Sequence, residues 1–140
     1  MPSVPAAVLE CQLAYGLRVS DVIDWKTSDL DCGRWTIHEK KTDKARRIQC
    51  TGQRRERLRA ISKSPWVFPG RRSHITRQAV WSAVRRACER LDLEGCIGTH
   101  SFRKAYAEHF YFLHGVHALQ KILNHDRIST TLIYAVGIKK

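Results

Sequence analysis

The chain has 140 residues and a mass of 16.2 kDa, which is the size of one domain and excludes a protein of two full-sized domains. Hydrophobic residues make up 43% and charged residues 27%, proportions that exclude a disordered or collagen-like chain. Lys and Arg number 25 against 13 Asp and Glu, and the resulting net charge of +12 favours a polyanionic partner, most simply nucleic acid, with solubility and membrane-surface binding as the alternatives.

The sequence lacks the patterns that would direct it to a membrane or an oxidising compartment. No apolar run approaches the roughly 18 residues of a membrane span, and the first residues do not form a signal peptide. The five cysteines include no Cys-X-X-Cys pair, so neither a disulfide framework nor a zinc site is expected. We therefore expect a cytoplasmic protein with no membrane partner.

The N-terminal segment predicts two helices joined by a corner. Ala6 to Tyr15 is rich in helix formers and stops at Gly16, a residue that favours the left-handed exit from a helix. Ser20 is suited to cap a second, short helix over residues 21–25. The corner is then Gly16-Leu17-Arg18, from which Arg18 projects.

A β-hairpin and a basic stretch follow. Arg34 to Glu39 and Arg46 to Thr51 alternate in the way that strands do, and the polar residues 40–45 between them predict the hairpin loop. Ten basic residues lie between Lys40 and Lys63. A solvated surface is one interpretation of this run, and a nucleic-acid-binding surface is the other.

The C-terminal half predicts helices. Thr76 is suited to cap a helix whose apolar residues recur at helical spacing and predict a core face: Val80, Val84, Ala87, Cys88 and Leu91. Further helices are expected over residues 99–113, 118–124 and 129–135. The sequence therefore predicts a mainly α fold with a small antiparallel β-sheet, of the α+β class.

A set of polar residues lies at corners or beside the predicted core helices: Arg18, Lys41, His100, Arg103, His125 and Tyr134. Each alone is more often a structural residue than a catalytic one. Together they meet the needs of phosphoryl transfer from a phosphodiester. Guanidiniums can clamp the non-bridging oxygens, imidazoles can donate hydrogen bonds or move protons, the phenol can attack, and the lysine can protonate the departing oxygen.

The order and spacing of these residues resemble a known family. Gly16-Leu17-Arg18-Val19-Ser20-Asp21 resembles the "GLR(I/V)S(E/D)" start of the tyrosine recombinase, or phage integrase, catalytic domain. Lys41-Thr42 with Arg46-Arg47-Ile48 is similar to its hairpin, His100 to Arg103 to its "HxxR", and Leu123-Asn124-His125 with Tyr134 to its "LGH...Y", with Asn124 in place of Gly. The resemblance covers Ala6 to Val136.

The resemblance implies roles for individual residues. Arg18 and Arg103 would hold the scissile phosphate, and His100 and His125 would hydrogen-bond to it. Lys41 would be the general acid, with Lys40 as the alternative. Tyr134 would be the nucleophile that forms a 3′-phosphotyrosyl link, and Asp21 would support the site. Several basic residues would contact DNA: Lys40, Lys44, Arg46, Arg47, Arg71, Arg72 and Arg77.

The resemblance also implies the tyrosine recombinase catalytic-domain fold and a site-specific recombinase or integrase that needs no cofactor, neither metal nor ATP. Its partners would be double-stranded DNA and other protomers, which form a tetramer in the full-length family. Residues 1–140 would be a single catalytic domain without the family's N-terminal core-binding domain and without its own first helix.

Three alternatives stay open at this point. The chain would bind DNA without cleaving it if it were a non-catalytic integrase remnant. It would relax supercoiled DNA without a specific site if it resembled type IB topoisomerases, which use similar tyrosine chemistry. It would do neither if it were a basic helical protein whose polar residues coincide with the motif by chance.

Overall fold

The computed structural model describes residues 2–95, 97–123 and 125–131. Within these ranges the chain is mainly helical, with one antiparallel pair of strands. The predicted fold class is confirmed. In chain order the elements are α1 (Val4–Tyr15), α2 (Val19–Val22), α3 (Thr27–Cys32), β1 (Arg34–His38), β2 (Ala45–Gln49), α4 (Gly52–Ile61), α5 (Arg77–Arg90), α6 (Thr99–His114) and α7 (Val116–Ile122).

The first helix forms as its sequence indicates. The Ser3 side chain accepts a hydrogen bond from the Ala6 N–H at 3.3 Å, and Pro5 lies in the first turn, where its missing N–H costs nothing. Gly16 ends α1 in the left-handed conformation. The second helix begins earlier than predicted, because Arg18 rather than Ser20 occupies its N-cap position.

The hairpin has the predicted form. Its register pairs Arg34 with Gln49 and His38 with Ala45, which leaves residues 39–44 as the loop. On β2 the side chain of Ile48 is buried whereas its neighbours on either side are exposed, as the alternation predicts.

Two helices flank the hairpin where none was predicted. The six-residue α3 buries only Leu30, and α4 buries only Leu58 among its basic side chains. Neither helix has the broad apolar face that makes a helix visible in a sequence. The structure therefore assigns the second half of the basic run, residues 52–61, to a helix.

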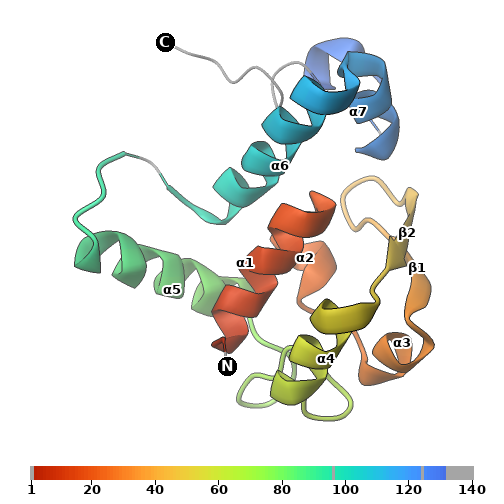
Figure 1. Cartoon of the computed structure of the whole chain (residues 1–140). Helices are drawn as coiled ribbons and strands as arrows, with labels where there is room; N and C mark the ends of the chain where they lie inside the picture. The colour runs from red at the N-terminus through yellow and green to blue at the C-terminus, as the bar shows by residue number, and fades with distance from the viewer. Residues whose placement is uncertain (1, 96, 124, 132–140) are drawn as a thin grey trace.

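The helix α5 begins as expected, since the Thr76 hydroxyl accepts from the Ala79 N–H at 3.1 Å. Val80, Val84 and Cys88 are buried, but the predicted core residues Ala87 and Leu91 are exposed. Both residues line an apolar groove together with residues of α1. The helix α1 covers the first turns of α5, and the C-terminal end of α5 extends past it (Figure 1).

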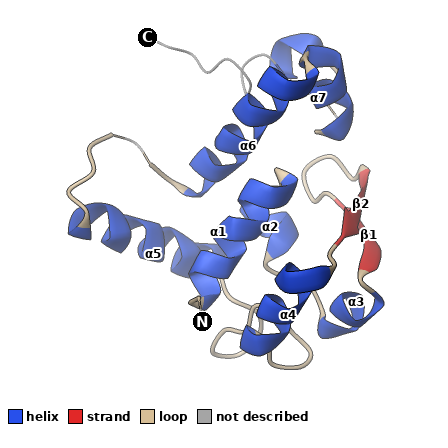
Figure 2. Cartoon of the chain, viewed as in Figure 1, coloured by secondary structure: helices blue, strands red, loops and turns tan. Residues whose placement is uncertain are grey.

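The buried hydrophobic residues of the described ranges include two packed clusters. The larger one centres on Trp25, whose ring packs edge-on against Trp35 with centroids 5.0 Å apart, and it joins α1, the hairpin and the start of α5. The smaller one joins α6 to α7 through Ala107, Leu119 and Leu123. Figures 1 and 2 show α6 beside α1, with α7 near the hairpin loop. No helix of the described chain is long and apolar enough to span a bilayer.

Candidate functional site

The corner between α1 and α2 forms the first side of the site. Gly16 adopts a φ of 68°, and its N–H donates to the Gln12 carbonyl at 2.8 Å. The buried Gln12 side chain then donates to the carbonyl of Leu17 at 3.1 Å. These contacts fix the backbone before Arg18, whose side chain is only 14% exposed.

The first turn of α6 forms the second side. The Gly98 N–H donates to the Ser101 hydroxyl at 3.0 Å, which fixes the start of the helix. His100 and Arg103 lie three residues apart and therefore on one face. The Arg103 side chain is fully buried, whereas His100 is exposed. The helix packs against α1, so this face meets the corner that carries Arg18.

The segment after α7 forms the third side. The backbone N–H of His125 donates to the Gln120 carbonyl at 3.1 Å, and Nδ1 lies 3.1 Å from the hydroxyl of the buried Thr131. Next to it, Asp126 pairs with Lys44 of the hairpin loop. This ion pair holds the hairpin loop beside His125.

The pKa of His100 reports on its neighbours. Partial burial of the imidazole lowers it, and four cations lower it further, namely Arg103, Lys104, Arg18 and Lys41. Such effects require the charges to lie close together. The corner, α6 and the hairpin therefore present their cations to one place.

The pKa of His125, in the segment after α7, is also lowered by burial and by Arg103 and Arg18. It is lowered to about 4, first by burial and then by the charges of Arg103, Arg18 and Lys44, whereas Asp126 opposes the shift. Both histidines therefore lie near the same two arginines. At neutral pH each imidazole is uncharged, so each can donate one hydrogen bond and accept another.

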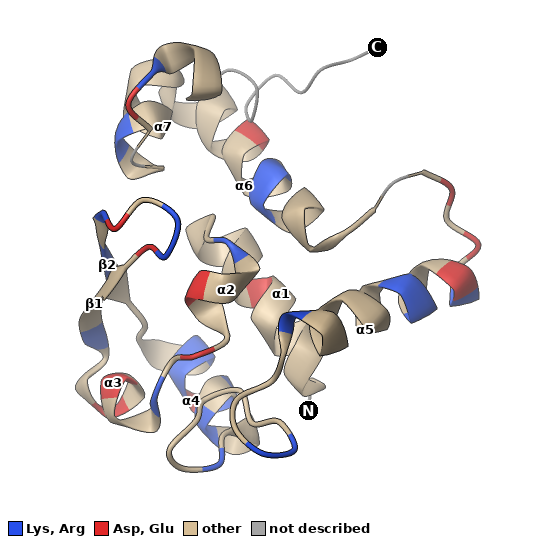
Figure 3. Ribbon diagram, turned by 180° about the vertical axis from the view of Figure 1, so that it is seen from behind, with Lys and Arg blue, Asp and Glu red and all other residues tan. Residues whose placement is uncertain are grey.

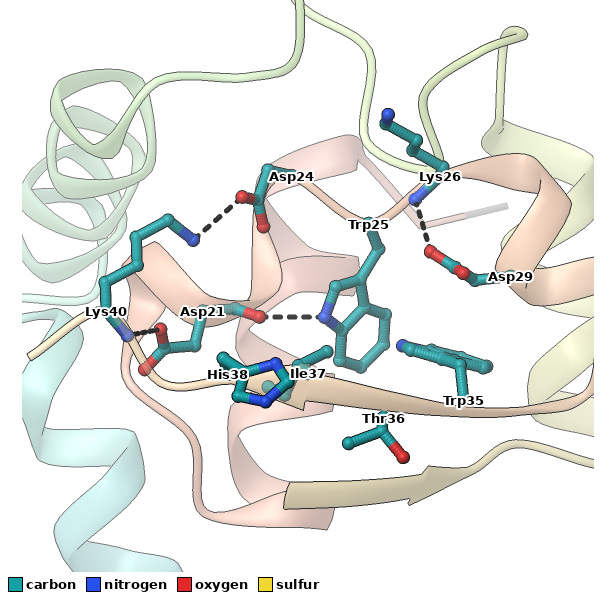
Figure 4. Close-up of a pocket in the computed structure, with 10 residues that line it drawn as sticks. All are labelled: Asp21, Asp24, Trp25, Lys26, Asp29, Trp35, Thr36, Ile37, His38 and Lys40. Atoms are coloured by element: carbon teal, nitrogen blue, oxygen red, sulfur yellow. Dashed lines mark hydrogen bonds and ion pairs between the residues drawn. The ribbon is translucent and has the colours of Figure 1, made fainter. Parts of the chain in front are cut away.

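The structure separates the two candidate lysines. Lys40 is tied to α2 and the turn after it, since its N–H donates to Asp21 Oδ1 at 2.9 Å and its Nζ lies 2.8 Å from Asp24 Oδ2 (Figure 4). Lys41, in contrast, acts on the pKa of His100. The geometry favours Lys41 over Lys40 for the site, and it makes the buried Asp21 a support for the hairpin.

Glu39 is a member of this region that the sequence motifs do not point to. Its fully buried carboxylate lies 3.4 Å from Arg18 Nη1 and 3.6 Å from Arg46 Nη1. Glutamates are seldom fully buried unless they are paired. Only its position at the end of a predicted strand next to Lys40 could have drawn attention to it.

The residues predicted to contact DNA fall into two groups. Arg46 is buried against Glu39, and Lys40 and Lys44 hold carboxylates of the chain itself. The others are exposed: Arg47 on β2, Arg71 and Arg72 in the loop before α5, and Arg77 at the start of α5. Arg77 lines a shallow cavity of about 270 Å³ together with Thr99, the first residue of α6.

Two further predictions concern the nucleophile and metals. Tyr134 lies outside the described residues, as does Asn124 of the predicted "LGH"-like motif. Among the residues that are described, no three His, Cys, Asp or Glu side chains are grouped so that they could hold a metal ion.

The chemistry of these side chains suits an anion. Arg18, Arg103 and Lys41 supply positive charge, and the neutral imidazoles of His100 and His125 supply hydrogen-bonding groups. Forked guanidinium groups match the oxygens of phosphate and carboxylate better than other cations do. The arrangement suits one phosphate group held from several sides.

Known proteins are similar to this chain over most of its length. The tyrosine recombinase XerC of Erythrobacter litoralis is 32% identical over 139 residues, which cover 91% of this chain and 44% of that protein. The XerD protein of Rhizobium meliloti is 31% identical over 142 residues, again 91% of this chain and 45% of the relative. The chain thus spans less than half the length of these relatives.

Solved structures share the fold. A lambda integrase dimer bound to a COC′ core site superposes with a TM-score of 0.79 at 19% identity, over 99% of this chain and 44% of that one. The XerH recombinase bound to its palindromic difH substrate gives 0.72 at 21% identity, over 96% and 43%. The model of the phage integrase family matches residues 3–138, and the chain therefore belongs to this family, as its motifs predicted.

Proposed function

We propose that residues 1–140 form the single catalytic domain of a site-specific DNA recombinase or integrase. The observation that carries the proposal is that α6, with the buried Arg103, packs closely against the corner that holds Arg18, while the hairpin loop with Lys41 is paired through Lys44 with the segment of His125. Membership of the phage integrase family and the recombinases among the relatives support it.

In the proposed reaction Tyr134 attacks a DNA phosphodiester. The bond from its phenolic oxygen to phosphorus forms, the bond to the 5′-oxygen breaks, and Lys41 gives that oxygen a proton. The product is a 3′-phosphotyrosyl link, which the 5′-hydroxyl of a DNA strand attacks in turn. Because each step exchanges one phosphoester for another, the reaction needs neither ATP nor a metal ion.

The described residues supply the surroundings for this step. Arg18 and Arg103 stabilise the charge that grows on the non-bridging oxygens, and their burial strengthens the effect because nearby water is excluded. His100 and His125 start neutral, so they can donate hydrogen bonds to the same oxygens and accept the proton of the phenol.

The proposed partners are double-stranded DNA and further protomers that assemble on it as a tetramer. The lambda integrase and XerH structures above are described as DNA complexes, and the former as a dimer. The exposed arginines 47, 71, 72 and 77 are the contacts we assign to the DNA backbone, since none of them has an ion pair within the described chain.

A covalent capture experiment tests the proposal and does not require the target sequence to be known. The chain is incubated with duplexes that carry a random core between constant arms and a nick that lets the cleaved fragment diffuse away. Complexes that survive denaturation are then recovered and sequenced. We expect enrichment of one sequence, no adduct with Tyr134→Phe, and a loss of roughly 10²–10³-fold with Arg18→Ala or Arg103→Ala.

Other outcomes would support the alternatives. Binding that weakens with salt but gives no Tyr134-dependent adduct would indicate a non-catalytic remnant. Relaxation of supercoiled DNA without sequence enrichment would indicate a topoisomerase. An adduct that persists undiminished in Tyr134→Phe would overturn the proposed nucleophile.

A further inference from the structure

One buried carboxylate contacts an arginine of the proposed phosphate site. Glu39 is fully buried, and its Oε2 lies 3.4 Å from Arg18 Nη1 and accepts a hydrogen bond from the Thr42 hydroxyl at 3.3 Å. Its other oxygen lies 3.6 Å from Arg46 Nη1. A single carboxylate thus lies between two guanidiniums from different elements.

Arg46 connects this carboxylate to α1. Its buried guanidinium donates through Nη2 to the carbonyl of Tyr15, the last residue of α1. Burial lowers the pKa of Arg46 and Glu39 opposes that effect, so the carboxylate helps keep the buried guanidinium charged. The contacts form a chain from the end of α1 through Arg46 and Glu39 to Arg18.

The contact with Arg18 leaves most of its donors available. A guanidinium has five N–H groups, and Glu39 approaches only the one terminal nitrogen. A long arginine side chain has many rotamers, and a fixed partner removes most of them before a ligand arrives. The carboxylate therefore limits how Arg18 can turn without covering all of its donors.

We propose that Glu39 is a positioning residue that orients the Arg18 guanidinium for the scissile phosphate; this rests on the proposed function. Removing the carboxylate of Glu39 is expected to have opposite effects on DNA affinity and on the rate of cleavage. Removing the negative charge beside Arg18 makes the site more attractive to a phosphate anion, yet it frees the guanidinium to turn. Glu39→Gln therefore binds DNA at least as tightly as the wild type and cleaves it more slowly.

A purely structural role for Glu39 makes a different prediction. Without the carboxylate, Arg46 would be a buried charge with no opposite charge, and such losses destabilise proteins. Replacing Arg46 by methionine in the same chain removes that charge. The variant Glu39→Gln/Arg46→Met would then regain both stability and cleavage if Glu39 served only to neutralise Arg46.

The experiment measures single-turnover cleavage of the DNA recovered by covalent capture, at saturating protein, together with DNA affinity and melting temperature. The chains compared are wild type, Glu39→Gln, Glu39→Gln/Arg46→Met and Lys41→Ala, all assayed below the lowest melting temperature. A second substrate carries sulfur in place of the bridging 5′-oxygen. Its thiolate leaves without a proton, so it bypasses the general acid.

We expect Glu39→Gln to cleave on the order of 10²-fold more slowly, as small misplacements in active sites do, with no loss of affinity. Neither Arg46→Met nor the sulfur substrate restores its rate, whereas the sulfur substrate restores Lys41→Ala. Cleavage at the wild-type rate, recovery with Arg46→Met, or recovery on the sulfur substrate would each overturn the role assigned to Glu39.

The proposed function can fail separately. If the wild-type chain forms no adduct on any duplex of the pool, the proposed function falls and the role of Glu39 falls with it. If the wild type forms the adduct and Glu39→Gln forms it equally fast, only the role of Glu39 falls.

Discussion

At the scale of single residues, the site is defined by charges that act on one another. His100 and His125 lie among cations of the corner, α6 and the hairpin, and both pKa values are lowered. A histidine whose pKa is lowered by folding binds fewer protons in the folded chain than in the unfolded chain. The free energy of unfolding is therefore reduced at pH values where the unfolded chain carries the proton and the folded chain does not.

The lowered pKa of His125 makes the stability of the chain depend on pH. His125 has a pKa of about 4 in the folded chain and an ordinary value of 6.5, so its contribution is constant above pH 6.5. Between pH 6.5 and about 4 the unfolded chain binds the extra proton, and the free energy of unfolding falls as the pH falls. Urea unfolding at a series of pH values measures the effect.

The variant His125→Gln provides the control for this prediction. Carboxyl groups also titrate below pH 5, but they do so in the wild type and in His125→Gln alike. The difference between the two proteins therefore isolates His125. The wild-type curve is expected to be the steeper one between pH 6.5 and 4. Parallel curves would contradict the lowered pKa.

At the scale of elements, α6, which carries Arg103, packs against the corner after α1, which carries Arg18. The contact depends on Gly16, where a Cβ atom would lie 2.2 Å from Cδ1 of Tyr106 on α6. The residue also has a φ of 68°, which L-amino acids with side chains rarely adopt. Gly16 is thus needed both for the turn and for the approach of α6.

Gly16→Ala is expected to destabilise the chain more than an alanine at another left-handed glycine. Gly52 has a φ of 63°, and a Cβ atom there would meet nothing within 4 Å, so Gly52→Ala costs only about 1–2 kcal/mol of backbone strain. Gly16→Ala adds the overpacking against Tyr106, typically about 1–3 kcal/mol more. Chemical denaturation of both variants measures the difference, and equal losses would contradict a tight contact between α1 and α6.

The elements also show which parts of the fold a single sequence can predict. The capping residue Thr76 predicts the start of α5, and the alternation around Ile48 predicts the hairpin. The helices α3 and α4 were missed because each buries a single leucine, and their positions depend on contacts with the rest of the chain. Local patterns predict an element when its own side chains form a face.

The residues of the site also divide into those that local patterns identify and those that only the folded chain brings together. The motif around Arg18 and the pair His100 and Arg103 could be identified from residue types and spacing. The burial of Glu39 could not, because its partners lie far away in the sequence and only the folded chain brings them together. The motif favoured Lys41 as the general acid and left Lys40 as the alternative, and only the folded chain shows that Lys40 is paired with Asp24.

At the scale of the whole molecule, the net charge of +12 is not equally available to a partner. Figure 3 shows basic residues on α4, on the loops near it and around the hairpin loop. On α4, however, Arg57 lies 2.7 Å from Glu10 and Arg59 lies 3.1 Å from Asp31. These arginines already have anionic partners, whereas Arg71, in the exposed loop before α5, has none among the residues that the structure describes.

Salt dependence of DNA binding distinguishes these two kinds of arginine. A cation that meets a DNA phosphate releases a counterion, so its loss lowers the slope of log affinity against log salt by about 0.9. Arg71→Ala is therefore expected to weaken binding and to reduce the slope by about that amount. Arg57→Ala lowers the net charge equally but breaks an internal ion pair, and its slope should match the wild type. Identical slopes for the two variants would mean that DNA responds to the total charge of the molecule and that the exposed loop makes no phosphate contact of its own.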